Sequence, residues 1–224
     1  MRNYKLHLIR HGITQGNLEG RYIGRTDLDL TPEAAQQLIE YREEGYYPPV
    51  ELVYSSPLRR CLETARCIYP DQKPVVVEEM RECDFGDFEG KSYQELEGDP
   101  DFDAWAKTGF AGSPKGGESS QDFILRLVNG LNAIIRHMME EGVFEAAVIT
   151  HGGAIMMMLS ALGLPKEQSF RWMAENGKGY TILVNPQMWM RDTAFEIYDT
   201  IPAQPEEEEG AWMDEIAWES EEEF

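Results

Sequence analysis

The sequence predicts a three-layer α/β/α sandwich built on a mostly parallel sheet. Short apolar runs of strand length alternate with longer segments whose apolar residues recur at helical spacing. This alternation is typical of parallel strands joined by right-handed crossovers. The chain has 224 residues, of which 42% are hydrophobic. It is therefore long enough and apolar enough for one full-sized domain with a buried core.

The strand candidates share a short apolar composition and are bounded by polar or turn residues. They are residues 5–9, 51–54, 75–77, 146–149, 180–184 and 194–198. We expect the first four of these segments to be buried strands.

Helices are predicted in the segments between the strands. One helix starts at Thr31, whose hydroxyl can cap it, with a proline in the first turn. A second starts at residues 56–57 and a third spans about residues 119–141, each with an apolar face. The last begins just after His151 and is almost wholly apolar as far as Leu164, so we expect it to be buried.

The charge is unevenly distributed along the chain. With 20 basic and 41 acidic residues the formal net charge is −21, and residues 203–224 contribute ten acidic and no basic side chains. Such a run predicts a solvated acidic tail after a single domain of residues 1–202. Its interleaved Trp212, Ile216 and Trp218 leave docking on the body or on a partner as an alternative. Residues 91–117 interrupt the alternation and predict an inserted lobe near the site.

The composition also excludes several classes of partner. A strongly negative chain without a basic patch repels phosphate backbones and anionic lipids, so we expect neither nucleic acid nor membrane as a partner. No apolar run reaches the length of a signal-peptide core or a spanning helix. The three cysteines form no Cys-x-x-Cys pair, which favours a cytoplasmic location. The oligomeric state stays open.

Three polar clusters follow predicted strands directly. They are Arg10-His11-Gly12, the serine and arginine residues of 55–60, and Thr150-His151-Gly152-Gly153. Ligands bind at the carboxyl ends of the strands in an open α/β sheet, so two histidines and at least two arginines should converge there. Arginine forks and helix amino termini both suit phosphate. Taken singly, each histidine or arginine is more often structural; their common position at one sheet edge favours a phosphate pocket.

The residues around these clusters form an ordered series of motifs. In chain order they are Arg10-His11-Gly12-x-Thr14-x-x-Asn17, Gly20-Arg21-x-x-Gly24-x-x-Asp27-x-x-Leu30-Thr31, Ser55-Ser56-x-Leu58-x-Arg60 with Thr64-Ala65, Arg81-Glu82-x-x-Phe85-Gly86-x-x-Glu89-Gly90, Gly117-Glu118-Ser119 and Thr150-His151-Gly152-Gly153. This series covers residues 5 to about 160 and resembles the signature of the histidine phosphatase superfamily, also called phosphoglycerate-mutase-like. A lone Arg-His-Gly is a weak signal, whereas the ordered set is specific.

The resemblance implies a role for each catalytic candidate. His11 matches the family's nucleophile, which becomes a phosphohistidine. Arg10, Arg60 and His151 match the pocket that neutralises the phosphate oxygens. Glu82 matches the proton donor to the leaving group.

The resemblance also implies a substrate side to the pocket. Thr14, Asn17 and Arg21 would line it, and Gly152 would let the backbone approach the anion closely. The implied chemistry needs no metal and no other cofactor. The chain departs from the family where Ile23 stands at a position often held by glutamine, which removes a polar group from the mouth of the pocket.

The sequence therefore predicts a metal-independent phosphomonoesterase that acts on a small phosphorylated metabolite. The motif form is more similar to the broad-specificity and alpha-ribazole-phosphate phosphatases than to the mutases. A phosphoglycerate mutase with the same pocket is the alternative, and a non-catalytic phosphate-binding or interaction protein is a weaker one. A nucleotide-binding oxidoreductase is rejected because no Gly-x-Gly-x-x-Gly follows the first strand.

Overall fold

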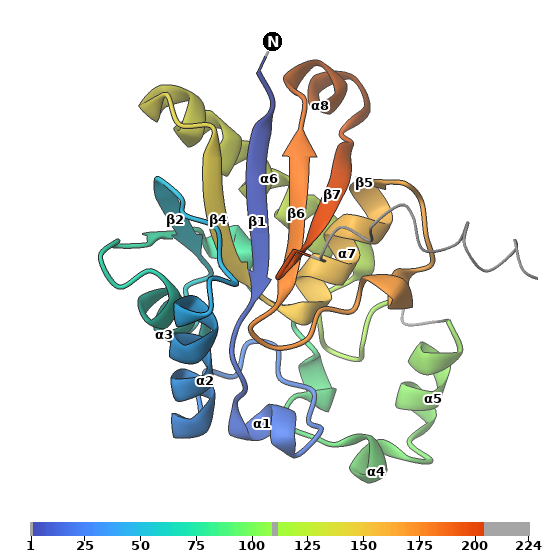
Figure 1. Ribbon diagram of the computed structural model, residues 1–224. Helices are drawn as coiled ribbons and strands as arrows, with labels where there is room; N and C mark the ends of the chain where they lie inside the picture. Colours follow the sequence, from blue (N-terminus) through green and yellow to red (C-terminus); the bar gives the residue numbers. More distant parts are fainter. Residues whose placement is uncertain (1, 109–111, 204–224) are drawn as a thin grey trace, which may run out of the picture.

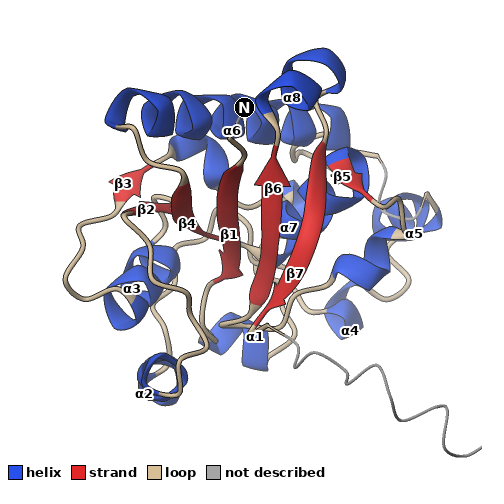
Figure 2. Cartoon of the chain, turned by 45° about the horizontal axis from the view of Figure 1, so that its top comes forward, coloured by secondary structure: helices blue, strands red, loops and turns tan. Residues whose placement is uncertain are grey.

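The computed structural model describes residues 2–108 and 112–203 and has a seven-stranded sheet at its centre (Figures 1 and 2). The strands lie in the order β3-β2-β4-β1-β6-β7-β5. Their bounds are β1 Tyr4–Arg10, β2 Leu52–Ser55, β3 Val75–Val76, β4 Glu145–Thr150, β5 Gly163–Leu164, β6 Gly179–Val184 and β7 Phe195–Ile201. The predicted α/β/α class is confirmed.

One strand of the sheet runs against the others. β1 to β4 run parallel to one another, whereas β6 is antiparallel to both β1 and β7. Residues 185–194 join β6 to β7 and are too few for a parallel crossover, which takes a dozen residues or more. The sheet is thus mostly parallel, as predicted, with β6 as the exception.

Helices cover both faces of the sheet (Figure 2). The helices are α1 Gln15–Leu18, α2 Pro32–Glu43, α3 Arg59–Ile68, α4 Tyr93–Leu96, α5 Pro100–Lys107, α6 Ser120–Glu141, α7 Gly152–Leu162 and α8 Pro186–Asp192, with 3₁₀ helices at Glu78–Met80, Gly86–Phe88 and Ser169–Trp172. The apolar sides of α6 and α7 pack on one face of the sheet, and those of α2 and α3 on the other. In the described part of the chain, none of these helices has the length and apolar character of a membrane span.

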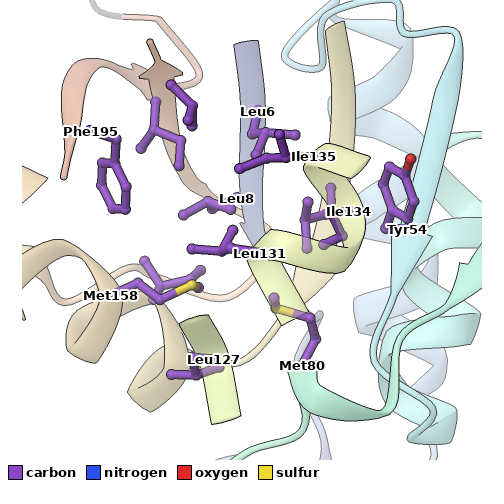
Figure 3. Packing of buried hydrophobic residues seen from close by; sticks show 14 of the residues in the cluster. Leu6, Leu8, Tyr54, Met80, Leu127, Leu131, Ile134, Ile135, Met158 and Phe195 are labelled. Atoms are coloured by element: carbon purple, nitrogen blue, oxygen red, sulfur yellow. The ribbon is translucent and has the colours of Figure 1, made fainter. Parts of the chain in front are cut away.

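The larger core lies between β1 and the helices α6 and α7 (Figure 3). Leu6 and Leu8 of β1 point toward this side, where they meet Leu127 and Leu131 of α6, and all four are fully buried. The next residue of β1, Ile9, belongs to the core on the opposite face. The alternation along β1 therefore fixes the strand between two helical layers and holds its carboxyl end in place.

Several predicted elements differ from the observed ones. Val75 and Val76 form an exposed edge strand, not a buried one. The second predicted helix begins at Arg59 instead of at residues 56–57, because Ser56 still continues the strand by donating its N–H to Ile149. The apolar run after His151 is helical only to residue 162 and then pairs with β7 as β5. The short helices α1 and α8 were not predicted.

The predicted lobe and loops gather beyond the carboxyl end of β1 (Figure 1). Residues 91–117 contain α4 and α5, apart from 109–111, which lie outside the described residues. Phe102 and Trp105 of α5 pack with Phe88 and against Tyr22 and Phe85. The acidic tail predicted for 203–224 also lies outside the described residues, except for Ala203.

Leu127 and Leu125 on α6 provide a matched test of the core. Leu127 is fully buried and Leu125 is exposed, so Leu127→Ala leaves a cavity whereas Leu125→Ala does not. We expect Leu127→Ala to lower the free energy of unfolding by about 2–5 kcal/mol and Leu125→Ala to change it by less than about 0.5 kcal/mol. Urea denaturation monitored by circular dichroism measures both values. Equal losses in the two variants would contradict this packing.

Candidate active site

His11 lies just beyond the carboxyl end of β1 and is almost fully buried. Its Nδ1 is 2.6 Å from the carbonyl oxygen of Gly12. A carbonyl can only accept, so Nδ1 carries the proton and donates this bond. The other ring nitrogen, Nε2, is left with its lone pair in the neutral ring. The local backbone thereby leaves Nε2 of His11 without a proton in the neutral ring.

The surroundings keep His11 neutral. Burial lowers the pKa of His11 well below its usual 6.5, and the charges of Arg60 and Arg10 lower the pKa further. Both causes act against the imidazolium form. The lone pair on Nε2 is therefore available at neutral pH and below it.

His151, at the amino end of α7, lies beside His11 with 5.3 Å between the ring centroids. Arg60 donates from Nε to its Nδ1 at 3.3 Å, and since arginine only donates, the proton of His151 is on Nε2. That Nε2 donates to Ser56 Oγ at 2.8 Å. The Sγ of Cys61 lies 3.5 Å from the same nitrogen. Burial lowers the pKa of His151 as well, so two neutral imidazoles stand side by side.

Two guanidinium groups give the site its positive charge. Arg60 is fully buried and donates to the carbonyls of Thr26 and Gly24, both at 2.8 Å. Arg10 donates from Nη1 to the carbonyl of Ala174 at 2.8 Å. Its buried Nε has no acceptor among the described residues. A buried donor without an acceptor, next to a second cation, fits a site that receives an anion.

Glu82 faces these groups from the loop before η2, residues Gly86–Phe88. Its two carboxyl oxygens accept from the backbone N–H groups of Cys83 and Gly153, each at 2.9 Å. Burial raises the pKa of Glu82, and the two hydrogen bonds oppose that shift. A Cβ at position 153 would lie 2.5 Å from Glu82 Oε1, so glycine is needed there for the carboxyl group to fit.

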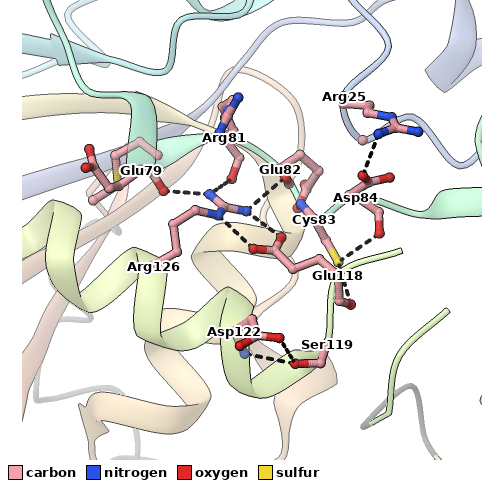
Figure 4. Close-up of polar contacts among 12 residues, drawn as sticks. Arg25, Glu79, Arg81, Glu82, Cys83, Asp84, Glu118, Ser119, Asp122 and Arg126 are labelled. Carbon is pink, nitrogen blue, oxygen red and sulfur yellow. Dashed lines mark hydrogen bonds and ion pairs between the residues drawn. The ribbon is translucent and has the colours of Figure 1, made fainter. Parts of the chain in front are cut away.

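Arg126 of α6 holds the segment that carries Glu82 (Figure 4). Its Nη1 donates to the carbonyls of Glu79 and Arg81, and its Nη2 donates to the carbonyl of Glu82 at 3.2 Å. Glu118 pairs with the same guanidinium at 2.6 Å. The backbone around Glu82 is therefore fixed by a single, partly buried arginine that is already neutralised.

These groups surround a cavity of about 230 Å³. It is lined by Arg10, His11, Asn17, Arg21, Tyr22, Ile23, Glu82, Phe85, Gly152, Gly153, Met156 and Met173. One part of the lining is polar and charged, and the other is aromatic and aliphatic. No group of three or more His, Cys, Asp or Glu side chains in the described ranges is arranged to hold a metal ion.

The structure brings most of the sequence-predicted site residues together. Arg10, His11, Asn17, Arg21, Glu82 and Gly152 line the cavity, while Arg60 and His151 are fully buried beside His11. Thr14 is placed differently from the prediction. It is fully buried and caps α1, where it donates to Asn17 Oδ1 at 3.0 Å. It therefore positions Asn17 and does not line the cavity.

Asn176 supports the site but was not predicted. Its Nδ2 donates to the carbonyls of His11 at 3.0 Å and Gly12 at 3.3 Å, and the neighbouring Gly177 N–H donates to the carbonyl of Arg10 at 3.0 Å. Gly177 has a φ of +75°, which glycine adopts readily. The Asn-Gly dipeptide signals a turn, but a sequence does not reveal what a turn contacts.

Comparisons with known proteins agree with this geometry. Residues 6–194 match the family model described as histidine phosphatase superfamily (branch 1). The chain is 28% identical over 186 residues to the adenosylcobalamin/alpha-ribazole phosphatase of Escherichia coli (strain K12), covering 81% of this chain and 90% of the relative. It is 31% identical over 181 residues to a broad-specificity phosphatase of Saccharomyces cerevisiae, covering 77% and 76% of the two chains.

Solved structures show the same likeness. The alpha-ribazole phosphatase from Shigella flexneri superposes with a TM-score of 0.73 at 25% identity, covering 90% of this chain and 98% of that one. A phosphoglycerate mutase from Thermus thermophilus superposes with a TM-score of 0.64 at 31% identity, covering 88% and 98%.

Inorganic phosphate tests the anion site directly. We expect phosphate at roughly 100 times its Kd to stabilise the folded protein by about 2.7 kcal/mol, measured as a rise in Tm. Arg10→Gln removes the charge beside His11 and should abolish this rise. Arg59→Gln is the matched control, since Arg59 is exposed and pairs with Asp27 and Asp29. An unchanged rise in Arg10→Gln would exclude Arg10 from the anion site.

Proposed function

The chain belongs to branch 1 of the histidine phosphatase superfamily, and from that premise we propose that it hydrolyses small phosphomonoesters through a phosphohistidine on His11. The observation that carries this proposal is the geometry of His11: its Nδ1 donates to Gly12, and burial beside Arg60 and Arg10 lowers its pKa, so the neutral ring has Nε2 free to attack. The phosphatase activity fits the named relatives.

In the first step Nε2 of His11 attacks phosphorus opposite the ester oxygen. An N–P bond forms as the P–O bond to the alcohol breaks. Arg10, Arg60 and His151 would face the three equatorial phosphoryl oxygens, where the two guanidinium groups balance the negative charge and the neutral His151 contributes a polar contact. Glu82 gives its proton to the departing alkoxide, which leaves as the alcohol. The raised pKa of Glu82 supports this role, because more of the carboxyl group is protonated before the step.

In the second step Glu82, now a carboxylate, takes a proton from a water molecule. The water oxygen attacks phosphorus, the N–P bond breaks, and His11 recovers its lone pair. Inorganic phosphate is released with the enzyme in its starting state. Each atom and proton is accounted for by His11, Glu82, the ester and one water, and the step needs no further reactant.

A phosphoglycerate mutase is the second candidate, because relatives of that name are similar to this chain. It would use the same first step and then return the phosphoryl group to a second alcohol instead of water. A purely binding role has less support, since all four core groups, His11, His151, Arg10 and Arg60, are present in one site.

Phosphate release with and without His11 is the primary test. In the presence of a metal chelator, we expect inorganic phosphate to appear from a panel of phosphomonoesters. His11→Ala should lower the rate by at least about 1,000-fold, because the nucleophile is lost. His137→Ala is the control, since His137 lies on α6 and bonds Tyr54 away from the cavity. Release that survives in His11→Ala would overturn the mechanism; transfer to an added alcohol without release would favour the mutase.

Glu82→Gln tests whether Glu82 donates the proton to the leaving group. The lowered pKa of His11 places the acidic limb of the rate profile below the usual 6.5, and the raised pKa of Glu82 places the basic limb above the usual 4.5. Activity therefore falls as pH rises through the Glu82 pKa. We expect Glu82→Gln to remove the basic limb and slow alkyl esters by about 10²–10⁴-fold.

Esters of p-nitrophenol distinguish this role from a structural one. Their leaving group departs without a proton. The rate of the p-nitrophenol burst in Glu82→Gln should therefore stay within about tenfold of the wild-type rate. A burst lost to the same extent as the alkyl-ester rate would show that Glu82 acts on the structure of the site and not as a proton donor.

A further inference from the structure

The arginine at the mouth of the cavity is already paired with carboxylates of the protein. Apart from the phosphate-facing Arg10, the cation among the lining residues is Arg21. Its Nε lies 2.6 Å from a carboxyl oxygen of Glu19, and its Nη1 lies 2.7 Å from a carboxyl oxygen of Glu95. The same Nη1 donates to the carbonyl of Gly90 at 2.6 Å. Two carboxylates therefore face one guanidinium, and their combined charge is negative.

A second arginine near the mouth is also paired with a carboxylate. Arg25 is the nearest arginine in sequence, and it pairs with Asp84 at 2.9 Å. No lysine occurs among the described residues that line the cavity. A second negative group on a substrate would meet no uncompensated cation among these residues, and it would be repelled by Glu19 and Glu95.

The remaining wall of the cavity is apolar. It consists of Tyr22, Ile23, Phe85, Met156 and Met173. Met173 is 67% exposed and the other four residues are partly buried, so part of this wall faces solvent. Contact with an apolar group would remove that surface from water, and methionine side chains adapt to ligands of different shape.

The inserted lobe holds the aromatic part of this wall in place. The rings of Tyr22 and Phe85 meet edge to face at 5.4 Å, and Trp105 of α5 contacts both, at 6.2 Å and 6.1 Å. Phe88 stacks on Trp105 at 5.7 Å. Because neighbouring rings already fix Tyr22 and Phe85, these side chains lose little conformational entropy when a substrate binds.

From the paired cation and the apolar wall, we propose that this site selects phosphomonoesters of uncharged, ring-bearing alcohols and discriminates against esters that carry a second negative group. The phosphoryl group lies against Arg10 and Arg60, and the ring of the alcohol packs on Tyr22, Phe85 and the methionines. This inference rests on the proposed phosphatase function and specifies its substrate class.

Two pairs of substrates test the inference. Benzyl phosphate and ethyl phosphate have alcohols of similar acidity and differ in the ring. Glycerol 3-phosphate and 3-phosphoglycerate differ by the replacement of a hydroxymethyl group with a carboxylate. We expect kcat/KM to be at least about tenfold higher for benzyl than for ethyl phosphate. We also expect it to be at least about tenfold higher for glycerol 3-phosphate than for 3-phosphoglycerate.

Variants connect each preference to its residues. Phe85→Ala should reduce the benzyl to ethyl ratio to about one-third or less of its wild-type value, and Tyr198→Ala, at an exposed position on β7, should leave it unchanged. The ratio is insensitive to the folded fraction because both substrates report on the same sample.

The double variant Glu19→Gln with Glu95→Gln removes both carboxylate charges that pair with Arg21. The glutamine amide introduced at position 95 can still close the capping box of α4. The double variant should raise kcat/KM for 3-phosphoglycerate by about fivefold or more and raise the ratio of this value to kcat/KM for glycerol 3-phosphate. Glu33→Gln with Glu140→Gln changes the net charge equally at exposed positions on α2 and α6 and should alter neither value.

The outcomes separate the two levels of the proposal. Phosphate release without either preference, or with 3-phosphoglycerate as the better of its pair, overturns the inference and leaves the phosphatase function standing. Release from none of the four esters overturns the phosphatase function and the inference with it. The substrate class is supported if the wild type shows both preferences, if Phe85→Ala weakens the preference for the ring, and if the double variant weakens the discrimination against the carboxylate.

Discussion

The parallel pairing of β1 with β4 is the constraint on which the site depends. Arg10 lies opposite Thr150 at the end of this ladder, and the N–H of His11 donates to the carbonyl of Thr150 at 3.0 Å. The residues that follow, His11 and His151, are therefore brought side by side although 140 positions separate them in the chain. A shift of one residue in this register would turn one imidazole away from the other. The cores on both faces of β1 hold the register.

Burial then sets the chemistry of the groups that the ladder brings together. Desolvation lowers the pKa values of both histidines and raises that of Glu82. The site thus holds a neutral imidazole and a carboxyl group that retains its proton more readily, which is the pairing that the proposed phosphoryl transfer to His11 would require. Arg60 remains charged in the interior because backbone carbonyls accept from its terminal nitrogens. Such preorganised donors act without reorganising during the reaction.

Two different segments of the chain support opposite sides of this centre. Residues 173–178 support the first motif through the carbonyl of Ala174, the amide of Asn176 and the N–H of Gly177. The inserted lobe supports the opposite side, where its aromatic cluster fixes Tyr22 and Phe85. The end of the cavity beside Arg10 and His11 is thus held by the sheet and its following loop, while the aromatic end is shaped by the lobe. In the proposed function, binding of phosphate and selection of the alcohol would depend on different segments.

The sequence by itself determined the layer architecture, the three polar clusters at one sheet edge and the motif order that identifies the superfamily. These features are local: apolar periodicity defines strands and helices, and a residue directly after a strand must lie at that strand's end. Only the tertiary structure decided that β6 runs antiparallel, that Thr14 is buried at the start of α1, and that Asn176 supports His11. It also decided that Glu19 and Glu95 together neutralise Arg21. Glu95 and Asn176 lie 74 and 165 positions along the chain from the partners they bond, and no local pattern encodes which distant segments meet once the chain has closed on its core.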